Sequence, residues 1–195
     1  MKRTLSFVTL LIALMLAAAA CGSSSETKSS SGSNFNAADV TFAQSMIPHH
    51  AQAIEMAKLA PTRAASAQVK ELAAKIEGAQ GPEITTMTGW LKDWGKKVPD
   101  TSMNGMEGMD GMEGMDSGAM PGMMTSTDMK KLKDATGADF DRMFLTMMIS
   151  HHEGAIDMAK TEQTDGKNSD AVSLAKKVET DQAGEITEMR TILSS

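Results

Sequence analysis

The 195-residue chain has one cysteine, no tyrosine, two tryptophans and five phenylalanines. A single cysteine excludes an internal disulfide framework, so the fold depends on its apolar core. The low aromatic content and the net charge of −6 exclude the basic surface typical of nucleic-acid-binding proteins, so no nucleic-acid partner is expected. No segment alternates apolar and polar residues as a half-buried strand does, which leaves an all-α fold.

The N-terminal residues have the layout of a secretory signal. Lys2 and Arg3 precede an apolar run, and four alanines lead to Cys21. This stretch resembles a bacterial lipoprotein signal, which implies cleavage after residue 20, lipidation of Cys21 and attachment to the outer face of a bacterial membrane. The alternative is an ordinary cleaved signal. Residues 21–37 are rich in serine and are expected to form a tether, followed by one domain at 38–195.

The domain contains an internal repeat. A shift of 102 residues aligns residues 39–91 with 141–193 without a gap. Apolar spacing predicts two helices in the first repeat, from about Ala38 to Leu59, ended by Pro61, and from about Thr62 to Trp94. The second repeat follows the same plan, with a break between Thr164 and Ser169. Two hairpins of this kind predict a four-helix bundle, because neither hairpin can bury its apolar face alone.

All four histidines lie within the most similar part of the two repeats, MIPHHAQAIEMA at 46–57 and MISHHEGAIDMA at 148–159. On a helix each segment presents two imidazoles and two thioethers within about three turns. This is a soft to borderline ligand set, which suits copper and above all Cu(I). The predicted metal ligands are His49, His50, His151, His152, Met46, Met56, Met148 and Met158.

One carboxylate in each repeat falls on the apolar face of the second helix. Glu83 lies in line with Leu72 and Met87, and Glu185 repeats this position. A carboxylate facing a core is costly unless it is paired or coordinated. Glu83 and Glu185 are therefore expected either to bind the metal or to orient the histidines.

Residues 101–129 join the repeats and contain nine methionines and six glycines. The glycine content opposes a helix, so a loop is expected. Its thioethers form a predicted accessory site for a soft ion: Met103, Met106, Met109, Met112, Met115, Met120, Met123 and Met124. The alternative interpretations are a sacrificial target for oxidation and a low-complexity segment without a function.

The two HH segments resemble those of the domain of unknown function 305 family. The resemblance covers most of residues 38–194 and implies an exported, ferritin-like helical bundle, with some relatives linked to copper tolerance or binding. A ferritin-like label also suggests a di-iron oxidase, but such sites use Glu-x-x-His. That motif is absent, and Met46 and Met148 stand three residues before His49 and His151.

The sequence therefore predicts an exported protein that binds Cu(I), and silver as a similar soft ion, for sequestration or handover. It predicts no organic cofactor and no catalysis, because no nucleophile–base pair or phosphate-binding loop is present. It does not identify a protein that would receive the metal. Two alternatives stay open, a metal-dependent oxidase that uses the four histidines with Glu83 and Glu185, and an interaction module whose histidines serve only packing.

Overall fold

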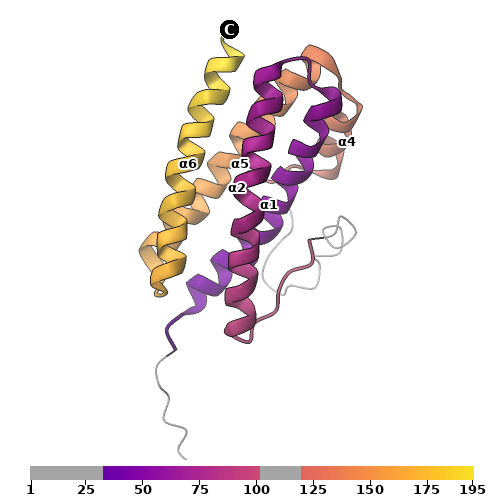
Figure 1. Ribbon diagram of the computed structural model, residues 1–195. Coiled ribbons are helices and arrows are strands. Elements are labelled where there is room, and N and C mark those ends of the chain that lie inside the picture. The colour runs from indigo at the N-terminus through magenta and orange to yellow at the C-terminus, as the bar shows by residue number, and fades with distance from the viewer. Residues whose placement is uncertain (1–32, 102–119) are drawn as a thin grey trace, which may run out of the picture. The chain divides into compact units, whose positions relative to one another are not determined.

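The computed structural model describes residues 33–101 and 120–195, which form a helical bundle without a β-sheet (Figure 1). The helices are α1 (Ala37–Arg63), α2 (Ala67–Asp93), α4 (Ser126–Asp134), α5 (Gly137–Asp165) and α6 (Ser169–Leu193). The α1–α2 and α5–α6 hairpins pack together mainly through α1 and α5, and α4 contacts both of these helices. This confirms the all-α bundle of two helical hairpins that the repeat predicts.

The signal, lipidation of Cys21 and most of the tether concern residues that lie outside the described part of the chain, as do Met103, Met106, Met109, Met112 and Met115. Within the described ranges, no helix combines the length and the apolar character that a membrane crossing requires.

Polar side chains mark where the main helices begin. The Asn36 side chain accepts hydrogen bonds from the backbone N–H groups of Ala38 and Asp39, and the Asp39 carboxylate accepts one from Asn36 in return. Asn168 caps α6 in the same way, through the N–H groups of Asp170 and Ala171. These caps satisfy donors that the first turn of a helix leaves without partners.

The prediction that Pro61 ends the first helix is wrong. α1 continues to Arg63, and the second helix begins at Ala67 rather than near Thr62. Pro61 stands two residues before the last residue of α1; it removes only its own backbone hydrogen bond, and its fixed φ fits a helix. Pro48 and Pro82 also lie inside helices. The expected break between Thr164 and Ser169 is confirmed, because α5 ends at Asp165.

The expected loop at 101–129 ends earlier than predicted, because α4 begins at Ser126. The Thr125 hydroxyl accepts a hydrogen bond from the Asp128 N–H and donates one to the Asp128 carboxylate. Met129 and Leu132, three residues apart, bury the apolar side of this helix. The Thr-x-x-Asp pattern before this pair was a sequence signal for the helix.

The connection between the repeats is long for a geometric reason. The end of α1 lies beside the start of α5, where Ala64 and Gly137 form an isolated bridge. α2 runs back from that end over 27 residues, which is about 40 Å of helix. The chain must therefore return along the length of the bundle before α5 begins, as in bundles with one crossover connection.

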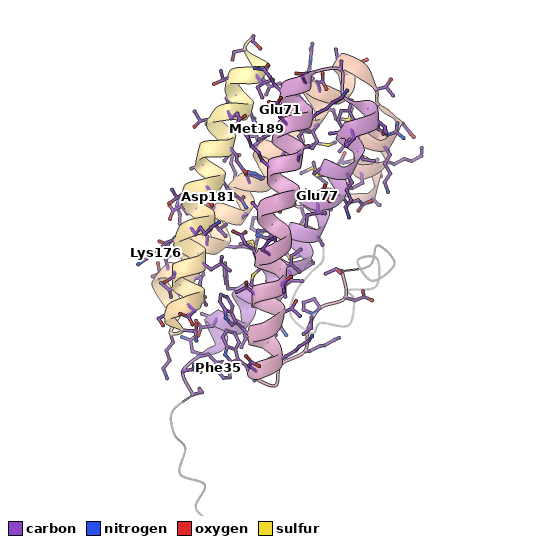
Figure 2. All side chains as sticks on the ribbon, in the orientation of Figure 1. Phe35, Glu71, Glu77, Lys176, Asp181 and Met189 are labelled. Carbon is purple, nitrogen blue, oxygen red and sulfur yellow. The ribbon has the colours of Figure 1, made fainter. Side chains whose placement is uncertain are left out.

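Apolar side chains form two layers, one toward each end of the bundle. The first contains Leu72, Ile76, Phe140, Phe144 and Met189 among others. The second contains Phe42, Met46, Met87, Leu91 and Val178 among others. Charged side chains such as Glu71, Lys176 and Asp181 are exposed, whereas Met189 is buried (Figure 2).

On all four long helices, a polar group separates the residues of one apolar layer from those of the other. This polar layer consists of His49, His50, Gln80, Glu83, His151, His152, Gln182 and Glu185. The repeat relates its members in pairs 102 residues apart, so the pseudo-twofold axis of the bundle passes through this layer.

Candidate metal centre

The four histidines lie in the polar layer and are all fully buried. His49 on α1 and His151 on α5 meet across the interface between the repeats, with ring centroids 3.7 Å apart and ring planes inclined by 35°. Ala53 and Ala155, one turn further along each helix, are small enough to let α1 and α5 approach this closely. The two HH segments thus form one continuous cluster rather than two separated ones.

The other two histidines are each bound to a carboxylate of the same repeat. His50 Nε2 lies 2.8 Å from Glu83 Oε2, and His152 Nε2 lies 2.6 Å from Glu185 Oε2. A carboxylate that holds one ring nitrogen fixes the tautomer and the orientation of the ring. The two hydrogen bonds fit an orienting role, which is one of the two roles that the sequence left open for Glu83 and Glu185.

The two carboxylates differ in their surroundings. Glu83 also accepts a hydrogen bond from Lys177 Nζ of α6 at 3.0 Å, which links the two hairpins. The repeat equivalent of Lys177 is Lys75, which pairs with Glu188 at 3.2 Å rather than with Glu185. Although burial acts to raise it, the hydrogen bonds from His50 and Lys177 hold the pKa of Glu83 below its usual value.

His49 has a backbone partner in place of a carboxylate. Its Nε2 lies 3.1 Å from the carbonyl oxygen of Pro121, which belongs to the methionine-rich connection between the repeats. A carbonyl only accepts, so Nε2 of His49 carries the proton and donates it. By the same reasoning His50 and His152 donate from Nε2 to their carboxylates. In its neutral form, a ring that donates from Nε2 keeps its lone pair on Nδ1.

Within the described part of the chain, these Nδ1 atoms have no hydrogen-bond partner. Ten buried side-chain nitrogen and oxygen atoms of the described residues lack one, and eight of the ten belong to the polar layer. They are Nδ1 of all four histidines, Nε2 of His151, both amide atoms of Gln80 and Oε1 of Gln182. Each unpartnered buried polar atom costs about 1–3 kcal/mol, so this concentration points to a ligand as its counterpart.

Three of the four histidine rings are held in the neutral form that a metal ligand requires. Burial, with a contribution from neighbouring His50, lowers the pKa of His49 to about 3. Burial also lowers the pKa of His50, against the opposing effect of Glu83, and places the pKa of His151 well below its usual value. These three imidazoles are therefore neutral at physiological pH, and a metal has no proton to displace from Nδ1.

The predicted methionine ligands occupy different places. Met46 lies in the second apolar layer, and Met56 and Met148 lie in the first, all fully buried. Met158 is only half-buried and lines a cavity of about 270 Å³ with Phe42 and other residues of α1 and α5. The loop methionines Met120, Met123 and Met124 are half-buried next to the HH segments.

The arrangement favours a soft ion over a hard one. In the described ranges, no three side chains among histidine, cysteine, aspartate and glutamate converge on a point where a metal ion would fit. Imidazole nitrogens supplemented by methionine sulfur suit Cu(I), which accepts few ligands, whereas a di-iron site needs bridging carboxylates. Glu83 and Glu185 are already engaged with histidine nitrogens.

Several residues around the cluster were not predicted from the sequence, namely Gln52, Pro121, Gly154 and Lys177. One signal was available, because Gln52 and Gly154 are repeat equivalents and are among the few differences between the two HH segments. Both of them contact the segment that contains Pro121.

Comparison with known structures supports both the fold and the chemistry. A secreted DUF305 protein from Streptomyces coelicolor is 32% identical, with a TM-score of 0.68, over 80% of this chain and 91% of that one. A DUF305 fragment from Deinococcus radiodurans is 27% identical, with a TM-score of 0.68, over 82% and 97%. Among curated proteins there is no match.

A third relative has been solved with metals. CopM in its Cu(I)-bound form is 28% identical, with a TM-score of 0.62, over 80% of this chain and 95% of that one, and Cu(II)-bound and silver-bound forms are also known. Residues 39–193 match the model of a domain of unknown function, DUF305, which spans both repeats and the connection between them. The chain therefore belongs to the DUF305 family.

Proposed function

We propose that this protein binds copper as Cu(I), and silver as a similar soft ion, at the histidine cluster between its repeats. The observation that carries the proposal is the arrangement of His49, His50 and His152. Each donates from Nε2 to a fixed acceptor, and its buried Nδ1 has no partner among the described residues. His151, which faces His49, adds a fourth imidazole.

The metal would supply the missing partner for these nitrogens. Coordination removes the cost of the unpartnered lone pairs, so binding also stabilises the fold. Met46, Met56 and Met148 are the buried thioethers nearest in sequence to the histidines and are the sulfur ligands we propose. The metal-bound structures of CopM show that a relative with this fold holds the same kind of ion.

We propose a role in sequestration or handover outside the cytoplasm rather than in catalysis. The similarity to a secreted relative supports export, and the lipid anchor on Cys21 remains part of this proposal. The methionine-rich segment before Pro121 would add weaker thioether sites for the same ion. An oxidase is less consistent with the site, because Glu83 and Glu185 are engaged with histidine nitrogens.

An anaerobic Cu(I) titration against a competing chelator tests the proposal. We would compare the full chain, a variant with all four histidines changed to alanine, and one with Met103, Met106, Met109, Met112 and Met115 changed to serine. We expect the histidine variant to lose the tightest site and the serine variant to keep it. Equal Cu(I) affinity of all three proteins would overturn the proposal and leave the histidines with a packing role.

A further inference from the structure

We infer that residues Met120–Met124, termed here the docked segment, position His49 for metal binding as Glu83 and Glu185 position His50 and His152. This inference rests on the proposed function. A backbone carbonyl outside the four long helices would hold one histidine ring in place, as carboxylates do for two other histidines of the cluster. The Pro121 carbonyl is the acceptor concerned, 3.1 Å from His49 Nε2.

The docked segment is fixed to α1 by a pair of hydrogen bonds. Gln52 Nε2 donates to the Met124 carbonyl at 2.8 Å, and the Met124 N–H donates to Gln52 Oε1 at 2.7 Å. Gln52 is buried and lies three residues after His49, almost one helical turn away. The same stretch of α1 therefore carries both the histidine and the side chain that holds its acceptor in place.

The docked segment also packs directly on α5, where two glycines make the contact. A Cβ atom at Gly154 would lie 2.0 Å from the Pro121 oxygen, so any larger residue would displace this carbonyl. Gly122 has a φ of +77° and approaches the backbone of Ser150 and His151, where its own Cβ would lie 2.5 Å from the Ser150 oxygen. Glycine is needed at both positions, for close approach and for the positive φ.

The docked segment thus explains a difference between the repeats. Gln52 and Gly154 occupy equivalent positions, but one must hold the segment through its side chain and the other must make room for it. The segment lies off the pseudo-twofold axis and supplies one carbonyl to one histidine. His151, the repeat equivalent of His49, has no partner for either ring nitrogen among the described residues.

Gly154→Ala tests the inference with little risk to the fold. Within a helix alanine is favoured over glycine, so the helices are retained while the added methyl group displaces Pro121. Gln52→Ala removes both hydrogen bonds to Met124 by an independent route. Gly184→Ala is the matched control, because it lies within α6 and its Cβ would meet no atom within 4 Å.

The first readout needs no metal. In ¹⁵N-edited NMR spectra of the metal-free protein, the Nε2–H protons of His49, His50 and His152 should exchange slowly with solvent, because each is buried and hydrogen-bonded. In Gly154→Ala and Gln52→Ala we expect only the His49 signal to be lost, with the other two as internal references. Retention of a slowly exchanging His49 proton in both variants would overturn the inference.

The second readout is Cu(I) affinity. Loss of an outer-shell partner typically costs about 10–100-fold in metal affinity, and we expect this loss in both variants but not in Gly184→Ala. Loss of the His49 signal with unchanged affinity would overturn the positioning role. Failure of the unaltered protein to bind Cu(I) would instead overturn the proposed function, while the proton exchange still tests whether the segment fixes His49.

Discussion

The carboxyl group of Glu162 lies against that of Asp39, at a position where the first repeat has Ala60. Asp39 is held as an anion, because it accepts backbone hydrogen bonds from Asn36, Lys167 and Asn168. Glu162 is almost fully buried beside it. Burial, reinforced by the adjacent negative charge of Asp39, raises the pKa of Glu162 to about 8.

Because the pKa of Glu162 is raised, we expect the stability of the fold to fall as the pH rises toward 8. A carboxyl group whose pKa is 4.5 when unfolded and about 8 when folded stabilises the fold fully below pH 4.5. That contribution is lost as the pH rises toward 8, because the folded state binds the extra proton. Glu162→Gln keeps a donor to Asp39 at every pH. We expect it to be more stable than the unaltered protein by about 1–3 kcal/mol at pH 8 and nearly equal in stability at pH 4.5.

Urea unfolding of the metal-free protein between pH 4.5 and 8.5 measures this difference. Glu71→Gln serves as the control, because Glu71 is exposed on α2 (Figure 2). A Glu162→Gln variant whose stability relative to the unaltered protein does not change with pH would show that Glu162 is ionised throughout this range.

A second prediction concerns the hydrogen bonds by which an aspartate of each repeat contacts the start of a helix in the other repeat. Asp141 on α5 accepts hydrogen bonds from the N–H groups of Ala65 and Ser66 at the start of α2, at 3.2 and 2.8 Å. Asp39 does the same for the start of α6 from the opposite repeat. Asp141→Asn leaves at most one of the two bonds and removes the charge. We expect a loss of about 1–3 kcal/mol in the free energy of unfolding.

Asp157→Asn, on the exposed side of the same helix, is the control for this prediction. Denaturant unfolding of both variants at pH 7 gives the comparison. Equal stabilities would mean that the contact between Asp141 and the start of α2 contributes nothing in solution.

The sequence predicted the helical bundle because the repeat and the apolar spacing depend on residues within one helix. It also placed the four histidines and the two carboxylates correctly on the inward faces, since these positions follow the helical period. It could not show that Glu83 bonds to His50 within one hairpin while His49 meets His151 across the two. Those contacts depend on how the hairpins pack, which a local period does not specify.

The docked segment was beyond prediction for a similar reason. Pro121 and Gly122 lie in a stretch whose composition indicates only a loop. Their role arises from contacts with residues of α1 and α5 that are 28 to 72 positions away in the sequence. The sequence shows that the second repeat has Gly154 where the first has Gln52. The reason for this difference is the docked segment, which belongs to neither repeat.

A third prediction distinguishes Met148 from Met158 as a ligand of Cu(I). Met148 is fully buried and lies one turn before His151 and His152, whereas Met158 is half-buried and lines the cavity beside Phe42. Exchange of methionine for leucine conserves volume and costs less than about 1.5 kcal/mol, so both folds should be retained. We expect Met148→Leu to weaken Cu(I) binding about tenfold and Met158→Leu to leave it almost unchanged.

Chelator competition under anaerobic conditions measures both affinities. The thermal stability of the metal-free variants is the control, because it separates loss of a sulfur ligand from loss of packing. If Met158→Leu weakens binding as strongly as Met148→Leu, the metal lies closer to the cavity than the histidine cluster suggests.

A fourth prediction addresses the carboxylates that hold His50 and His152. Glu83→Gln and Glu185→Gln keep the shape of each side chain but remove the charge that makes the imidazole a stronger ligand. We expect each change to lower Cu(I) affinity by about 10–100-fold. Lys177→Met removes the ion pair on the outer side of Glu83 and leaves its bond to His50. Since Lys177 is more than half exposed, this variant should bind Cu(I) nearly as the unaltered protein does.

The metal-loaded protein distinguishes orientation from direct ligation by these carboxylates. If Glu83 and Glu185 only orient the rings, the Nε2–H protons of His50 and His152 remain hydrogen-bonded when Cu(I) is bound, and their NMR signals persist. If either carboxylate turns to the metal, its histidine loses the acceptor and the corresponding signal disappears. Persistence of both signals together with unchanged affinity in the glutamine variants would show that the carboxylates serve the fold alone, because binding would then depend on neither their charge nor their hydrogen bonds.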